Sequence, residues 1–102
     1  MDRVATFKEF IQRKPDDPFP RYGLAMEYRN TGKYQQAQKV FDTLMEKFPD
    51  YLAAYLMAGN NLESLDHKDD ARTVYQRGVK AASKQGDGHT KGELEAALAA
   101  LG

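Results

Sequence analysis

RYGLAMEYRNTGKYQQAQKVFDTLMEKFP, residues 21–49, is the stretch that decides the fold, because its pattern returns 34 positions later. The second copy, residues 55–83, reads YLMAGNNLESLDHKDDARTVYQRGVKAAS. Small residues recur at Ala37 and Ala71, and large aromatic residues recur at Phe41 and Tyr75. Phe7, one period before Phe41, continues the series toward the N-terminus. A fixed period of this length indicates a repeat architecture, in which each unit buries its apolar face against the next.

The order of these positions resembles the tetratricopeptide repeat, a helical hairpin of about 34 residues. The chain is similar to the short standalone bacterial proteins of this family, which implies an all-α fold, a right-handed α-α superhelix (solenoid) of about six helices. The expected single domain, 1–102, comprises a half-repeat helix in 1–15, a first full repeat in 18–51, a second in 52–85 and a capping helix in 89–102. Arg21 and Ser83 depart from the pattern, because the family usually has a large aromatic residue and often a proline there.

Apolar periodicity and helix-end signals predict the individual helices. Side chains that recur at three- and four-residue steps share one face of a helix, and proline, glycine and capping aspartates mark its ends. The predicted helices run from Asp2 to Arg13, Pro18 to Thr31, Tyr34 to Lys47, Tyr51 to Leu65, Asp69 to Ser83 and Thr90 to Leu101. Asp17 and Asp50 are the expected caps of the second and fourth helices. No segment alternates apolar and polar residues as a strand does, so no sheet is expected.

Composition narrows the classes of partner. Fifteen Lys and Arg residues balance fifteen Asp and Glu residues, so the chain lacks the excess positive charge that attracts nucleic acid or an anionic membrane surface. There is no cysteine, which excludes disulfides and thiolate chemistry. No segment reaches the ~20 apolar residues of a membrane-spanning helix, and the first residues lack the apolar run of a signal peptide. We therefore expect a cytoplasmic protein with no nucleic-acid or membrane partner.

In the tetratricopeptide repeat family, the leading helix of each repeat lines a concave groove in which a ligand peptide usually lies. When the groove positions of the family are aligned with this chain, the resemblance implies two sets of groove residues. They are Phe19, Tyr22, Met26, Arg29 and Asn30 from the first full repeat, and Ala53, Leu56, Asn60, Glu63 and Ser64 from the second. One end of this set is aromatic and apolar, and the other is rich in amides. Such a mixture suits an extended peptide or a partner helix, with Asn60 pairing with the peptide main chain.

Internal packing is an alternative use of the same side chains. Tyr22, Met26 and Leu56 would then lie under the final helix, which would fold into the groove as a cap. In that case the free groove would shrink to Phe19, Arg29 and the edge near Glu63.

Some relatives hold the C-terminal carboxylate of chaperone tails with a clamp of lysine, asparagine and arginine residues. Only Asn60 occupies a clamp position in this chain. Tyr22 and Met26 replace the cationic and amide residues that the clamp places before it. The resemblance therefore argues against chaperone-tail binding.

The polar clusters of the chain form no recognisable catalytic or metal-binding motif. His67 lies in a predicted turn with three aspartates, and His89 is isolated, whereas a zinc site needs three or four convergent ligands. Gly86-Asp87-Gly88 has neither the preceding strand nor the following Gly-Lys-Ser/Thr of a phosphate loop. We therefore expect no enzyme activity, no cofactor and no metal.

Two functional hypotheses follow. The first is a protein-interaction module that binds a peptide or a helical segment of a partner in the groove. The second is a self-associating scaffold module, a weak homodimer or larger homo-oligomer formed through the terminal helices. It is motivated by the first helix, which lacks its family partner, and by the apolar stripe of the last helix, Leu94, Leu98 and Leu101.

Overall fold

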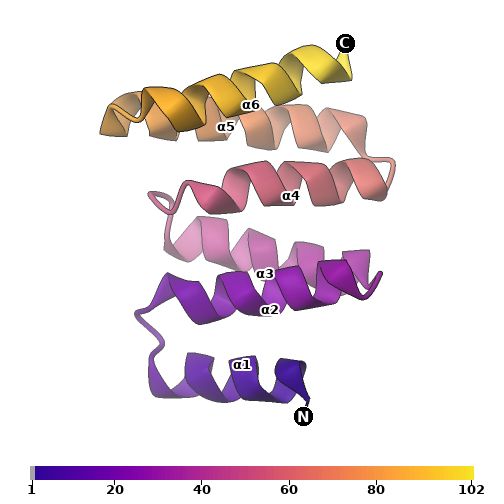
Figure 1. Cartoon of the computed structure of the whole chain (residues 1–102), viewed down its shortest axis with the longest axis vertical. Coiled ribbons are helices and arrows are strands. Elements are labelled where there is room, and N and C mark those ends of the chain that lie inside the picture. The colour runs from indigo at the N-terminus through magenta and orange to yellow at the C-terminus, as the bar shows by residue number, and fades with distance from the viewer. Residues whose placement is uncertain (1) are drawn as a thin grey trace.

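A computed structural model describes residues 2–102, and within them the chain forms six α-helices and no β-strand. The helices are α1 (Arg3–Arg13), α2 (Pro18–Asn30), α3 (Tyr34–Lys47), α4 (Ala53–Ser64), α5 (Lys68–Gln85) and α6 (Gly88–Leu101). Figure 1 shows them stacked in chain order, with the two ends of the chain at opposite ends of the stack. The prediction of an all-α fold with about six helices is confirmed, and α3 has the predicted bounds.

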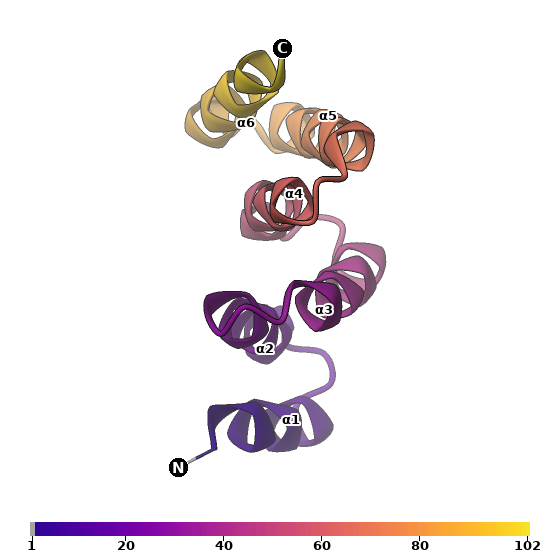
Figure 2. The same cartoon turned by 90° about the vertical axis from the view of Figure 1, so that its right-hand side faces the viewer.

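The stack is elongated, with dimensions of 39 × 29 × 18 Å. Each helix packs against the next one in the chain, and α4 also touches α2 and α6. Figure 2 shows α2, α4 and α6 toward one side of the stack and α3 and α5 toward the other. Within residues 2–102, α1 packs closely against α2 alone. Helices far apart in the chain are therefore also far apart in the stack.

Aspartate side chains cap three helices. Oδ1 of Asp2, of Asp17 and of Asp87 each accepts a hydrogen bond of 3.0 Å from a backbone amide in the first turn of α1, α2 and α6 respectively. These bonds satisfy amide groups that have no partner within the helix. The prediction that Asp50 caps the fourth helix is wrong, because α4 begins only at Ala53 and Leu52 occupies the cap position without a side-chain bond.

Close approach of neighbouring helices explains the repeated small residues. Ala25, Ala37 and Ala71 are fully buried, as are the aromatic rings of Phe41 and Tyr75. The second full repeat gives an example of this close approach. A Cβ atom added at Gly59 would overlap the Tyr75 ring, with the ring Cδ1 only 2.6 Å away. The separation of α4 and α5 is therefore one that glycine alone allows at this position.

One polar side chain lies inside this core. Asn61 is fully buried, and its Nδ2 donates hydrogen bonds to the carbonyl oxygen of Tyr34 (2.9 Å) and to Oε1 of Gln38 (3.0 Å). Both acceptors belong to the first turns of α3. Asn61 therefore joins α4 to α3 and helps to fix the position of the helix that carries the second half of the predicted groove.

Candidate functional site

The predicted groove residues lie on α2 and α4, which are in contact on one side of the stack (Figure 2). Among residues 2–102, Phe19 is the most exposed large apolar residue, with 61% of its surface accessible. The other members divide into two groups. Those that are partly buried are Tyr22, Met26, Arg29, Leu56 and Asn60, and those that are exposed are Asn30, Ala53, Glu63 and Ser64.

The final helix does not extend over the α2 half of this surface. α6 packs against α5 and touches α4, but it has no close contact with α2. The alternative in which Tyr22 and Met26 pack under the final helix is therefore not supported. Leu94 is fully buried, and Leu98 and Leu101 lie against the same core, so the apolar stripe of α6 is used within the chain.

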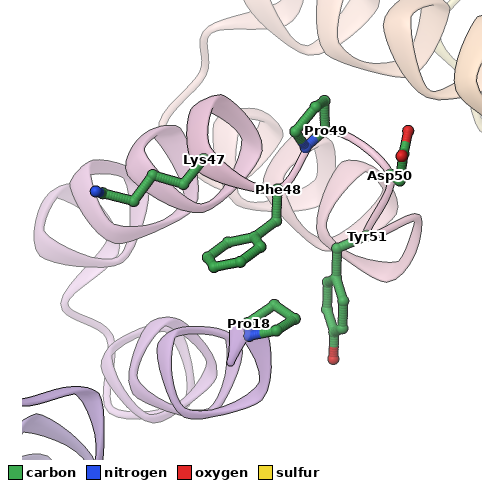
Figure 3. Close-up of a pocket in the computed structure, with 6 residues that line it drawn as sticks. All are labelled: Pro18, Lys47, Phe48, Pro49, Asp50 and Tyr51. Atoms are coloured by element: carbon green, nitrogen blue, oxygen red, sulfur yellow. The ribbon is translucent and has the colours of Figure 1, made fainter. Parts of the chain in front are cut away.

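A largely apolar hollow of about 360 Å³ opens where Pro18, the first residue of α2, comes close to the end of α3 and the connection that follows it, and Lys47 and Asp50 are the charged residues that line it. Figure 3 shows Pro18 facing the ring of Phe48, with Tyr51 beside them. The ring of Tyr51 also packs against Tyr22 of the predicted groove, with ring centres 5.6 Å apart and planes tilted by 58°. The guanidinium of Arg21 lies 5.7 Å from the centre of the Phe48 ring, which is cation–π distance. The hollow therefore continues the aromatic end of the predicted groove.

Sequence reasoning did not assign Pro18, Phe48 and Tyr51 to this surface. Tyr51 is the first residue of the predicted fourth helix, and Phe48 follows the end of the predicted third helix at Lys47. The contact between Tyr22 and Tyr51 joins α2 to the connection between α3 and α4. Helical periodicity carries no signal for such a contact, because it relates only residues within one helix. The one local signal was an aromatic residue just after the helix-ending Pro49.

The polar end of the surface is organised by the hydroxyl of Tyr75. It lies 2.6 Å from Oδ1 of Asn60 and also forms a hydrogen bond with Oε2 of Glu63. Since the hydroxyl carries one hydrogen, it can donate to only one of these oxygens at a time. One acceptor is thus left free for another donor. That Asn60 pairs with a peptide main chain stays a prediction.

Arg29 is a partly buried cation that has no partner in the described part of the chain. Its Nε is buried and forms no hydrogen bond within residues 2–102. None of the ion pairs among these residues includes its guanidinium. Burial raises the pKa of the Tyr22 and Tyr75 hydroxyls, and the positive charge of Arg29 acts on both pKa values in the opposite direction. The charge of Arg29 therefore acts electrostatically on both hydroxyls.

We expect the free energy of unfolding to fall as the pH rises above about 10. Burial is the main cause that raises the pKa of Tyr22, Tyr51, Tyr55 and Tyr75, and at Tyr75 the bond to Glu63 adds to it. The fold thus favours the protonated hydroxyls. Their contribution to stability is complete below the unfolded pKa of about 10 and is lost as the pH rises through the higher folded values.

Urea unfolding at a series of pH values between about 8 and 11 measures this slope. The variant Tyr75→Phe lacks the hydroxyl that hydrogen bonds with Glu63, so its stability should fall less steeply above pH 10. An equally steep fall in wild type and variant would contradict the role given to Tyr75.

The remaining polar clusters have structural partners. Nδ1 of His67 lies 3.9 Å from Oδ2 of Asp70, and both side chains are exposed. Gly86 ends α5 with a positive φ of 72°, and Asp87 caps α6. In the part of the chain that the structure describes, no three His, Cys, Asp or Glu side chains converge as a metal site requires. No helix there is both long and apolar enough to span a lipid bilayer.

Comparison with known proteins gives one family. A sequence model of the tetratricopeptide repeat matches residues 28–101. No curated protein matches the chain. The chain is 36% identical to a tetratricopeptide repeat domain protein from Salinibacter ruber solved in solution, with a TM-score of 0.81 over 85% of this chain and 88% of that one. A crystal structure of a tetratricopeptide repeat domain protein from the same organism is 35% identical, with a TM-score of 0.78 over 84% and 96%.

A third similar structure supports the fold alone. It is the solution structure of a protein from Bordetella parapertussis, which is 21% identical to this chain. The TM-score is 0.83, and the match covers 99% of this chain and 88% of that one. The expected helical solenoid is therefore found in solved structures that match 84% to 99% of the chain.

Proposed function

Because the chain belongs to the tetratricopeptide repeat family, we propose that it binds an extended peptide or a helical segment of a partner protein on the surface formed by α2 and α4. The fold of this family generally mediates protein–protein interaction, and its domains are generally not enzymes. The proposed contact residues are Phe19, Tyr22, Met26, Arg29, Asn30, Leu56, Asn60 and Glu63. A cytoplasmic location and the lack of a nucleic-acid partner stay predictions from the sequence.

The exposure of Phe19 is the observation that carries this proposal. Its phenyl ring is 61% exposed, beside the partly buried Tyr22 and one residue from the apolar hollow at Pro18. An apolar surface that stays in contact with water gains free energy when a partner covers it, and aromatic anchors supply much of the energy of such contacts. The chain therefore offers an apolar anchor point next to polar groups that can fix the orientation of a peptide.

Phe10 provides a matched control for Phe19, because these are the two large apolar side chains that are strongly exposed in residues 2–102. Phe10 lies on α1, outside the proposed surface. Partners captured from a lysate of the source organism by the immobilised chain should bind Phe19→Ala and Tyr22→Ala about tenfold more weakly. They should bind Phe10→Ala as they bind wild type. Full retention of every partner by Phe19→Ala, Tyr22→Ala and Asn60→Ala would count against this surface.

Self-association through the terminal helices is the second candidate function. It is favoured by the 45% exposure of Phe10 on α1, a helix that packs closely against α2 alone. It is disfavoured by α6, whose leucines lie against the core of the same chain. Light scattering at about 10 and 500 μM separates the two functions. A strict monomer at the higher concentration would exclude the homo-oligomer, and a dimer lost in Phe10→Ala would favour it.

A further inference from the structure

We propose that the partner segment is an acidic peptide in extended conformation, held at two points. An apolar side chain of the peptide enters the hollow lined by Pro18, Phe48 and Tyr51, and a carboxylate further along the peptide binds the guanidinium of Arg29. This inference rests on the proposed function and adds to it the chemistry of the partner.

The two points lie along one face of α2. Positions 18, 22 and 29 are separated by four and seven residues, close to one and two helical turns, so their side chains fall within a sector of about 40°. Tyr22 links the two ends of this row. Its ring packs against Tyr51 of the hollow, and its hydroxyl lies close enough to Arg29 to be affected by the positive charge. A peptide that follows the row contacts the hollow first and the cation last.

Arg29 selects an anion as the second group. Nε of its guanidinium is buried and forms no hydrogen bond within residues 2–102, and the residue as a whole is only partly buried. A partly buried charge is screened less by water than an exposed one, so it attracts an incoming anion more strongly. The planar guanidinium presents paired N–H donors that match the two oxygens of a carboxylate.

Glu63 is the acidic residue of this surface, and it makes no direct ion pair with Arg29. Its Oε2 forms a hydrogen bond with the Tyr75 hydroxyl. Its negative charge nevertheless lies on the same surface and repels a peptide carboxylate. The variant Glu63→Gln should therefore bind an acidic peptide more tightly than wild type does.

The length of α2 sets the spacing within the peptide. Eleven residues separate Pro18 from Arg29, which at about 1.5 Å per helical residue gives about 16 Å. An extended chain advances about 3.3 Å per residue, so the apolar and acidic residues of the peptide are about five positions apart.

A titration with defined peptides tests both points. The probe is acetyl-Leu-Ser-Ser-Ser-Ser-Asp-Ser-amide, followed by amide chemical shifts of the full chain, and its control replaces Asp with Asn. We expect the Asp peptide to shift signals of α2 and residues 48–51 and to bind about fivefold more tightly than the Asn peptide at low salt. A third peptide that places Asp directly after Leu should show no such preference.

Variants of Arg29 test whether this residue causes the preference for the Asp peptide. In Arg29→Gln the ratio of the two dissociation constants should fall to about one, and Arg29→Lys should keep part of it because the charge remains. Arg13→Gln is the matched control, since Arg13 is exposed on α1 and pairs with Glu9. In Arg13→Gln the ratio of the two dissociation constants should equal that of wild type. The same spectra show whether each variant is folded.

The results of these titrations distinguish a failure of the two-point site from a failure of the proposed function. Equal binding of the Asp and Asn peptides, with shifts confined to α2 and α4, would overturn the role of Arg29 and leave the binding surface intact. A preference for the Asp peptide that persists in Arg29→Gln would also overturn the role of Arg29. If neither peptide shifts these signals at about 10 mM, the two-point site is wrong. Loss of natural partners in Phe19→Ala would still support the proposed function.

Discussion

Phe41→Ala is expected to lower the free energy of unfolding by about 3–5 kcal/mol. Phe41 is fully buried and belongs to the hydrophobic core. Its removal loses the free energy of burial and leaves a cavity that a close-packed core fills only in part. A domain of this size has a total stability of about 5–15 kcal/mol, so the loss would be a large fraction of it.

Urea unfolding followed by far-UV circular dichroism measures this change, and Phe10→Ala is the control. Phe10 is 45% exposed, so the same chemical truncation should cost about 1 kcal/mol or less. Similar losses in the two variants would show that the Phe41 site does not form the core as the structure has it.

Gly59→Ala is expected to destabilise the chain by about 2 kcal/mol or more, although alanine is the better helix former by about 1 kcal/mol. The added methyl group would overlap the Tyr75 ring. That ring cannot move away freely, because it is fully buried and its hydroxyl bonds to Asn60 and Glu63. The cost of separating α4 from α5 therefore exceeds the gain in helix propensity.

Gly92→Ala should change stability in the opposite direction. Gly92 lies inside α6, and no heavy atom within 4 Å would meet an added Cβ. We expect a gain of about 0.5–1 kcal/mol in the free energy of unfolding. Thermal or urea unfolding of both glycine variants gives the comparison, and a gain in Gly59→Ala equal to that in Gly92→Ala would contradict the close approach of α4 and α5.

A double substitution separates the clash from other effects of the methyl group. Tyr75→Phe removes the hydroxyl bonds that hold the ring, so the ring gains freedom to move away from a methyl group at position 59. The combined variant should lose less stability than the sum of the two single variants. The preceding repeat shows the same pairing in another form, because Ala25 and Phe41 occupy the equivalent positions and are both buried.

Much of the fold could be predicted from the sequence, because the repeated pattern predicts both where the helices lie and which helices pack against each other. The end of α5 shows where this stops. Ser83 was expected to end the helix because it aligns with Pro49, but serine keeps its amide hydrogen and has no ring to clash with the preceding turn. The helix therefore continues to Gln85, and Gly86 ends it with a left-handed backbone conformation.

The candidate site was less accessible to sequence reasoning. The alignment of the two repeats indicates which residues share one face of α2 or of α4. The structure places these residues on the two helices. Register says nothing of the hollow beside Tyr51, because that contact joins the start of α2 to the connection between α3 and α4. Nor does it reveal that Arg29 forms no ion pair within residues 2–102, since this depends on which way the side chains around it point. Contacts between helices decide both features.

The place of α1 in the stack has a consequence for local motion. α1 contains no buried residue and packs closely against one helix, α2, in the part of the chain that the structure describes. In a linear array, each unit is stabilised only by its immediate neighbours, so a terminal helix with one neighbour can detach while the rest stays folded. The backbone amides of α1 should therefore exchange with solvent through local opening, at a lower free energy than those of α3 and α4. The chain would fray from its N-terminal end before it unfolds as a whole.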